Sequence, residues 1–107
     1  MSTAVINPNF DAFYNSFYIQ GIIDVFGDAN VRFSARPFPP LPSECLAFIV
    51  WDQTERRVVI DPCDGGVIVN RIGLEWCDVY GKVNLTPSVI PKEHLHKCVP
   101  IGPSFAI

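Results

Sequence analysis

The chain has 107 residues, of which 49% are hydrophobic and 18% charged, and it carries a net charge of −3 at pH 7. A chain of this length fits one domain, residues 1–107, whose core needs no disulfide or metal to be stable. The basic residues are scattered, no apolar run is long enough to span a membrane, and the N-terminus has no signal-peptide pattern, so we expect a cytoplasmic protein that binds no nucleic acid.

The first third of the chain predicts a strand, a helix and a second strand, a unit that places two parallel strands in one sheet. Residues 3–7 are apolar and β-branched, and residues 30–35 alternate between apolar and polar side chains, as strands do. Between them, residues 10–26 predict a helix that covers the sheet, with Asn9 as its N-cap and Gly27 just past its C-terminus. Its apolar face, at steps of three and four residues, consists of Phe10, Phe13, Tyr14, Phe17, Tyr18, Ile22, Val25 and Phe26.

The middle of the chain predicts a hairpin of two strands. The prolines of residues 36–44 indicate a loop. Residues 45–51 are continuously apolar, as expected of a strand covered on both faces. A short polar turn connects them to the apolar stretch 57–61, and the turn 62–66 ends that strand. For residues 67–76, a strand, a loop and one helical turn stay open as alternatives.

The last third predicts two more strands. Residues 77–85 alternate, with Tyr80, Lys82 and Asn84 on one face and Val79, Gly81, Val83 and Leu85 on the other. Residues 91–97 suggest one or two helical turns, and residues 98–101 begin a strand that breaks at Gly102. The predicted fold class is α/β, with a mainly parallel sheet and one hairpin. Because the chain stops on apolar residues, we expect an incomplete or truncated fold whose exposed apolar surface promotes self-association.

Lys82 is the most informative position, because a charged side chain interrupts a strand that otherwise reads as buried. In one interpretation, its stem packs on Tyr80 and its ammonium reaches solvent at the sheet edge. In the other, Lys82 is fixed at a cleft, where it pairs with Asp61, Asp64 or Asp78 or with an anionic ligand. The alternating pattern favours the first interpretation.

Asp61 and Asp64 stand where a strand ends, in the stretch VVIDPCDGG. Ligands of open α/β sheets bind beyond such carboxyl ends, and two carboxylates there can act as acid or base or hold a divalent metal. Ordinary turn chemistry explains the same residues. Gly102 and Ser104, in the turn IGPSF, offer backbone N–H groups and a hydroxyl to a sugar or phosphate, with the same ambiguity.

A zinc site is a further alternative for the cysteines and histidines. The chain has no C-x-x-C pair, and structural zinc sites bring ligands in close pairs. We therefore expect buried structural cysteines and solvent-facing histidines, with no metal and no cofactor. The residues concerned are Cys45, Cys63, Cys77, Cys98, His94 and His96.

Four segments together resemble the N-terminal region of bacterial two-domain glycosyltransferases of the twin-Rossmann type, which include enzymes of capsular and other surface polysaccharide biosynthesis. These segments are INPNFDAFYNSFYIQGIIDVFG, VVIDPCDG, EWCDVYGKVNL and VPIGPSFAI. The likeness covers most of the chain in segment order, and DVYGKVN and IGPSF are its most specific parts. It implies a Rossmann-like sheet that binds a saccharide or lipid-linked acceptor, often without a bound metal, while a C-terminal domain absent from this chain binds the nucleotide-sugar.

On this resemblance, Tyr80, Lys82 and Asn84 would line or support the acceptor cleft, with Asp61 and Asp64 close by and Asp64 as the catalytic base. Gly102 and Ser104 would add further substrate contacts. The weaker alternative for Lys82 is one internal ion pair that fixes the packing of the sheet. Without the donor domain, the chain alone is expected to be inactive. The alternative is a standalone, non-enzymatic α/β module that binds a protein or a carbohydrate.

Overall fold

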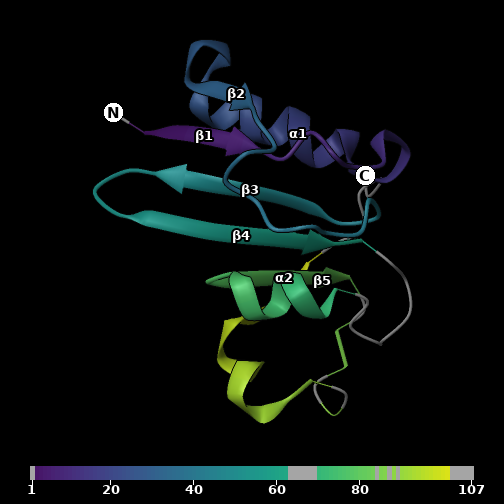
Figure 1. The fold of residues 1–107 in the computed structure, drawn as a ribbon. Helices are drawn as coiled ribbons and strands as arrows, with labels where there is room; N and C mark the ends of the chain where they lie inside the picture. The colour runs from purple at the N-terminus through teal and green to yellow at the C-terminus, as the bar shows by residue number, and fades with distance from the viewer. Residues whose placement is uncertain (1, 63–69, 84, 87, 89, 102–107) are drawn as a thin grey trace.

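The computed structural model describes residues 2–62, 70–83, 85–86, 88 and 90–101 (Figure 1). Within them, six strands form one mixed sheet with a small number of helices packed around it, which confirms the α/β class. In chain order the elements are β1 (Thr3–Ile6), α1 (Ala12–Phe26), η1 (Asp28–Asn30), β2 (Val31–Phe33), β3 (Leu46–Trp51), β4 (Glu55–Asp61), α2 (Arg71–Trp76), β5 (Val79–Val83), η3 (Lys92–Lys97) and β6 (Cys98–Ile101).

Five of the six strands run in one direction, and β3 runs against them. The order across the sheet is β2-β1-β3-β4-β5-β6. β3 is antiparallel to both of its neighbours, β1 and β4, whereas the other pairs are parallel. In Figure 1 the arrows of β1, β4 and β5 point to the right and that of β3 points to the left. The predicted mainly parallel sheet with a β3–β4 hairpin is therefore confirmed for the described residues.

The helix α1 covers one face of the sheet, which we name the α1 face. Ala4 and Ile6 of β1 and Leu46 and Phe48 of β3 are buried beneath Ile22 of α1. The two residues of each strand are two positions apart, so they point to the same side of the pleated sheet. The unit β1-α1-β2 has parallel strands and a covering helix, as predicted. Side chains packed around this cluster are Phe10, Tyr18, Ile19, Phe26, Val31, Val50, Val58 and Ile60.

The opposite face, which we name the α2 face, has its own buried cluster. Ala47 of β3, Val59 of β4 and Tyr80 of β5 lie there beneath Leu74 of α2. The loop between β2 and β3 and the segment before η3 complete the cover. The residues that they contribute to this cluster are Leu41, Cys45 and Ile90, and Cys77 follows α2. The sheet is thus the middle of three layers, with different segments on its two faces.

The start of α1 differs from the prediction. The helix begins at Ala12, so Asn9 is not its N-cap. The Asn9 side-chain amide instead donates to the carbonyl of Leu41 at 3.3 Å, a partner far away in the sequence. Gly27 does follow the C-terminus of α1, and its φ of 86° is a backbone conformation that suits glycine.

The predicted apolar face of α1 is also partly wrong. Phe17 is 50% exposed and Val25 is 78% exposed. Successive helix residues are rotated by about 100° around the helix axis, so Phe17 lies on the side away from Ile22. Its apolar side chain and apolar neighbours in the sequence do not change this position. Ile19, which the pattern omitted, packs against the α1-face cluster instead.

The remaining elements resolve the ambiguous stretches. α2 begins right after Asn70, whose side-chain oxygen accepts a hydrogen bond from the Gly73 amide at 2.8 Å and so caps the helix. The polar segment 91–97 forms the 3-10 helix η3, in line with the expected helical turns. Of the helices in the described residues, none combines the length and the apolar character needed to cross a bilayer.

Candidate functional site

The shared strand direction brings the carboxyl ends of β1, β4 and β5 to one edge of the sheet, which we name the carboxyl edge. The helices that follow leave on opposite faces, because α1 after β1 packs on the α1 face and α2 after β4 packs on the α2 face. In α/β sheets, ligands bind beyond the carboxyl ends at the point where the connections diverge in this way. The carboxyl edge between β1 and β4 is therefore the candidate site.

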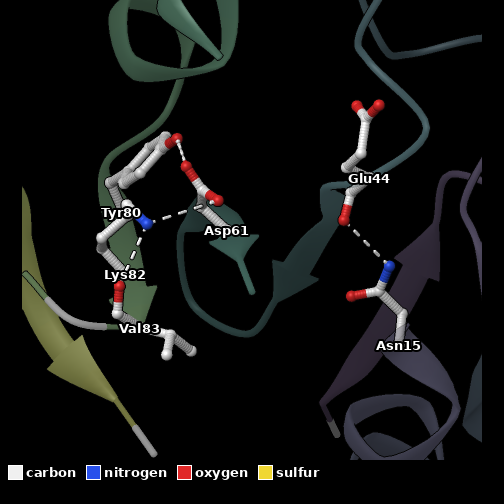
Figure 2. A network of polar contacts seen from close by, with 6 residues as sticks. All are labelled: Asn15, Glu44, Asp61, Tyr80, Lys82 and Val83. Atoms are coloured by element: carbon white, nitrogen blue, oxygen red, sulfur yellow. Dashed lines mark hydrogen bonds and ion pairs between the residues drawn. The ribbon is translucent and has the colours of Figure 1, made fainter. Parts of the chain in front are cut away.

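A buried polar cluster of Asp61, Tyr80 and Lys82 lies at this edge (Figure 2). Asp61 ends β4, and its Cα pairs with that of Lys82 in β5. The Tyr80 hydroxyl donates to Asp61 Oδ2 at 2.6 Å, and Lys82 Nζ lies 3.8 Å from Asp61 Oδ1. Lys82 Nζ also donates to the Val83 carbonyl at 3.0 Å. All three residues of the cluster have no exposed surface.

The burial of Lys82 contradicts the interpretation in which its ammonium reaches solvent at the sheet edge. β5 is not an edge strand, because β4 and β6 pair with it on its two sides. Of the proposed partners, the one at ion-pair distance in the described residues is Asp61. Asp78 has another role, since its carboxylate accepts a hydrogen bond from the Arg57 backbone amide at 2.9 Å.

The electrostatics of the cluster favour a locked arrangement. Burial raises the pKa of the Tyr80 hydroxyl, and the hydrogen bond to the Asp61 carboxylate raises it further. The phenol therefore stays protonated and keeps donating at neutral pH. A buried carboxylate is stable only when it is paired and hydrogen-bonded, and Asp61 has both kinds of partner. The cluster fastens the ends of β4 and β5 together, and it presents no exposed atom at the surface.

A second polar group fastens the start of α1 to the segment before β3. Asn15 is fully buried, and its side-chain nitrogen donates to the Asp11 carbonyl at 3.1 Å. The same nitrogen donates to the Glu44 carbonyl at 3.2 Å (Figure 2). Next to β1, the side-chain oxygen of Asn7 accepts from the Asn9 amide at 3.1 Å. Amide groups thus hold the chain on the β1 side of the carboxyl edge.

Asn15 has a further property, because its Oδ1 atom is buried without a hydrogen-bond partner among the described residues. An unpaired buried acceptor costs stability, so it calls for a specific explanation, of which a functional role is one. Sequence reasoning did not single out this residue. The available signal was a polar side chain in step with Tyr18, Ile19 and Ile22, the residues that face the sheet.

The other residues proposed from the sequence cannot be compared with the structure. Asp64, Asn84, Gly102 and Ser104 lie outside the described residues, as does Cys63. The structure therefore brings together Asp61, Tyr80 and Lys82 out of the seven proposed site residues.

The three described cysteines belong to the α2-face cluster or pack against it. Cys45 and Cys77 are buried, whereas Cys98 is half-buried. Burial raises the pKa of the Cys77 thiol to about 11, even though the nearby Lys97 ammonium lowers it. His96 is exposed, as expected, but His94 is half-buried. In the part of the chain that the structure describes, no three His, Cys, Asp or Glu side chains come together as metal ligands.

Comparison with known proteins identifies no relative: no family model, no curated protein and no solved structure matches the chain.

Proposed function

We propose that this chain is the acceptor-binding portion of a glycosyltransferase and that it holds a saccharide acceptor at the carboxyl edge between β1 and β4. The observation that carries the proposal is the divergence of α1 and α2 to opposite faces on the two sides of β3. α/β enzymes bind their substrates at the carboxyl ends of the strands where the connecting helices diverge in this way.

The topology supports a Rossmann-like relationship in two respects. β1-α1-β2 and β4-α2-β5 are both units in which a helix connects neighbouring parallel strands. The antiparallel β3 departs from a wholly parallel Rossmann sheet. In the proposal, β3 separates two half-units, and the resemblance of the four sequence segments supplies the link to glycosyltransferases.

Within the proposed site, the buried cluster has a positioning role. Asp61, Tyr80 and Lys82 hold the end of β4 in register with β5, so the residues that immediately follow β4 start from a fixed point. Asp64, three positions further on, is the proposed catalytic base. It would take the proton from the attacking acceptor hydroxyl, as general bases do.

The remaining proposed residues would contact the sugar, and the nucleotide-sugar would be bound by another domain. Asn84 follows β5 in the sequence, and Gly102 and Ser104 follow β6. Because β5 and β6 are parallel to β4, chain segments that leave their ends start at the same edge as Asp61.

The proposal is tested by a transfer assay with a panel of nucleotide-sugars and saccharide acceptors, run on this chain and on a version extended by any downstream reading frame. We expect the extended protein to transfer a sugar and its Asp64→Asn variant to be slower by roughly 100-fold or more. Asp52→Asn is the matched control, since Asp52 lies exposed in the β3–β4 hairpin. Absence of transfer by the extended protein, or equal activity of Asp64→Asn and wild type, would contradict the proposal.

A binding module without catalysis is the second candidate. It is favoured by the complete burial of Asp61, Tyr80 and Lys82, which leaves no reactive group of the cluster at the surface. In that case the chain alone binds a saccharide with the same affinity as the extended protein, and no nucleotide-sugar supports transfer.

A further inference from the structure

A hollow of about 500 Å³ lies on the α2 face over β1, between Trp51 of β3 and the segment that follows β2. We propose that it binds an acidic sugar, meaning a pyranose ring that carries a carboxylate, such as a uronic acid. The lining residues are Val5, Arg32, Ser34, Arg36, Pro37 and Trp51. The volume is within the range of small-ligand sites and suits one or two sugar rings.

The strand register explains why these residues meet. Val5 of β1 pairs with Arg32 of β2 on one side and with Ile49 of β3 on the other. Paired residues of adjacent strands point to the same face, so Arg32 lies beside Val5 on the α2 face. Trp51, two positions after Ile49, points to that face as well. Val5 is buried and forms the floor, while Arg32 and Trp51 are exposed at the sides.

The charge of the hollow selects an anion. Arg32 and Arg36 are both exposed, and neither forms an ion pair within the described residues. No acidic residue is among the lining side chains, although the chain as a whole has a net charge of −3. Two guanidinium groups in such surroundings are suited to a carboxylate, which arginine binds through paired hydrogen bonds.

Trp51 and Ser34 add the features that favour a sugar. The Trp51 side chain ends β3 with 44% of its surface exposed, so its flat ring is open to stacking against the C–H face of a pyranose, as large amphipathic rings do. The Ser34 hydroxyl, which already accepts from the Arg36 amide at 3.4 Å, can donate to a sugar oxygen.

The hollow lies over β1 and β2, and none of Asn7, Asn15 and Asp61 lines it. One side of the hollow reaches the carboxyl ends of β1 and β2, because the Ser34 amide donates to the carbonyl of Ile6. The other side, at Trp51, lies far from the proposed acceptor site. Trp51 is the last residue of β3 and pairs with Thr3, the first residue of β1. Leu46, at the other end of β3, pairs with Ile60 next to Asp61. Binding in the hollow therefore does not depend on the proposed transferase activity, and the two sites can be distinguished by the residues that respond to a ligand.

The test is calorimetric titration of the whole chain with a disaccharide that contains glucuronic acid, with its neutral glucose counterpart and with uridine diphosphate. We expect the acidic disaccharide to bind at least tenfold more tightly than the neutral one, because a charged hydrogen bond is lost in the latter. Arg32→Gln and Arg36→Gln should each weaken binding roughly tenfold. Arg56→Gln is the matched control, because Arg56 is exposed and pairs with Val50 of the α1-face cluster, so it points away from the hollow.

Several outcomes would overturn the site. These are no binding of the acidic disaccharide, equal binding of the neutral one, tighter binding of uridine diphosphate, or equal weakening by Arg56→Gln. A second measurement needs no variant: the ligand should shift the NMR signals of the Trp51 indole N–H and the Arg32 amide. Binding of the ligand without a change in either signal would equally reject the proposal.

Discussion

Replacing Lys82 by methionine tests the buried cluster most severely. The substitution preserves the length and the apolar stem of the side chain but removes the ammonium that lies 3.8 Å from Asp61 Oδ1. At that distance, and with an effective dielectric constant of about 20, the lost attraction is about 4 kcal/mol. Removing one partner of a buried ion pair costs about 3–5 kcal/mol in measured cases, so the two approaches agree. The Val83 carbonyl also loses the donor that Lys82 Nζ supplies at 3.0 Å.

The loss is large compared with the whole stability of a small domain, which is about 5–15 kcal/mol. We therefore expect urea unfolding of Lys82→Met, followed by circular dichroism at pH 7, to show a free energy of unfolding lower by about 4 kcal/mol. Lys92→Met, at an exposed position of η3, is the control and should stay within about 0.5 kcal/mol of wild type.

The double variant Asp61→Asn with Lys82→Met separates a lost ion pair from a general packing defect. It leaves no unpaired charge, and the Tyr80 hydroxyl, which donates to Asp61 at 2.6 Å, can still donate to the asparagine oxygen. The double variant should therefore be more stable than the sum of the single losses predicts, by about 1–3 kcal/mol. A Lys82→Met variant within about 1 kcal/mol of wild type, or strictly additive losses, would show that the ion pair between Lys82 and Asp61 contributes little to stability.

Three further predictions concern other parts of the fold. The Cys77 thiol has a pKa of about 11 in the native state and about 9 in the unfolded state. Between pH 9 and 11 the unfolded state therefore loses a proton that the native state keeps. The free energy of unfolding should fall as the pH rises from about 9 to 11. The fall should be smaller in Cys77→Ala, and parallel stability curves for the two proteins would contradict this. Gly73→Ala should destabilise α2 by about 1–3 kcal/mol, because a new Cβ would lie 2.5 Å from the Asn70 side chain. Denaturant unfolding should show a smaller effect of Gly73→Ala in an Asn70→Ala background, which itself loses the helix cap. Additive losses from the two substitutions would argue against the contact. Phe17 and Val25 are 50% and 78% exposed on α1, and we expect them to support self-association. Sedimentation at increasing protein concentration should detect this association, and lysine at both positions should reduce it. A wild-type protein that stays monomeric at every concentration would contradict the expectation.

Local patterns predicted the order and type of most elements because each pattern reports a property of its own segment. The alternation of residues 77–85 identified β5, and the proline-rich loop and polar turn delimited the β3–β4 hairpin. The end of α1 followed from Gly27, the residue at which the backbone takes a positive φ. Its beginning did not follow from Asn9, because a contact with the distant Leu41 decides what that side chain does.

The site depends on register, which the sequence does not specify. Three aspartates were candidate partners for Lys82, and the pairing of β4 with β5 selects Asp61 among the described ones. Likewise, Arg32 and Arg36, in β2 and just after it, meet Trp51 of β3 across β1, which lies between β2 and β3. Asn15 reads as an ordinary polar helix residue until its contact with the Glu44 carbonyl is seen.

In the proposed function, a saccharide acceptor binds at the carboxyl edge between β1 and β4. NMR titration of the isotope-labelled chain with a panel of oligosaccharides tests this binding, by following the backbone amides of Asn7, Asn15 and Asp61 beside those of the hollow on the α2 face. We expect an acceptor oligosaccharide to shift the signals of these three residues in a saturable way. Signals at the carboxyl edge that stay unchanged with every oligosaccharide, even where the hollow responds, would contradict it.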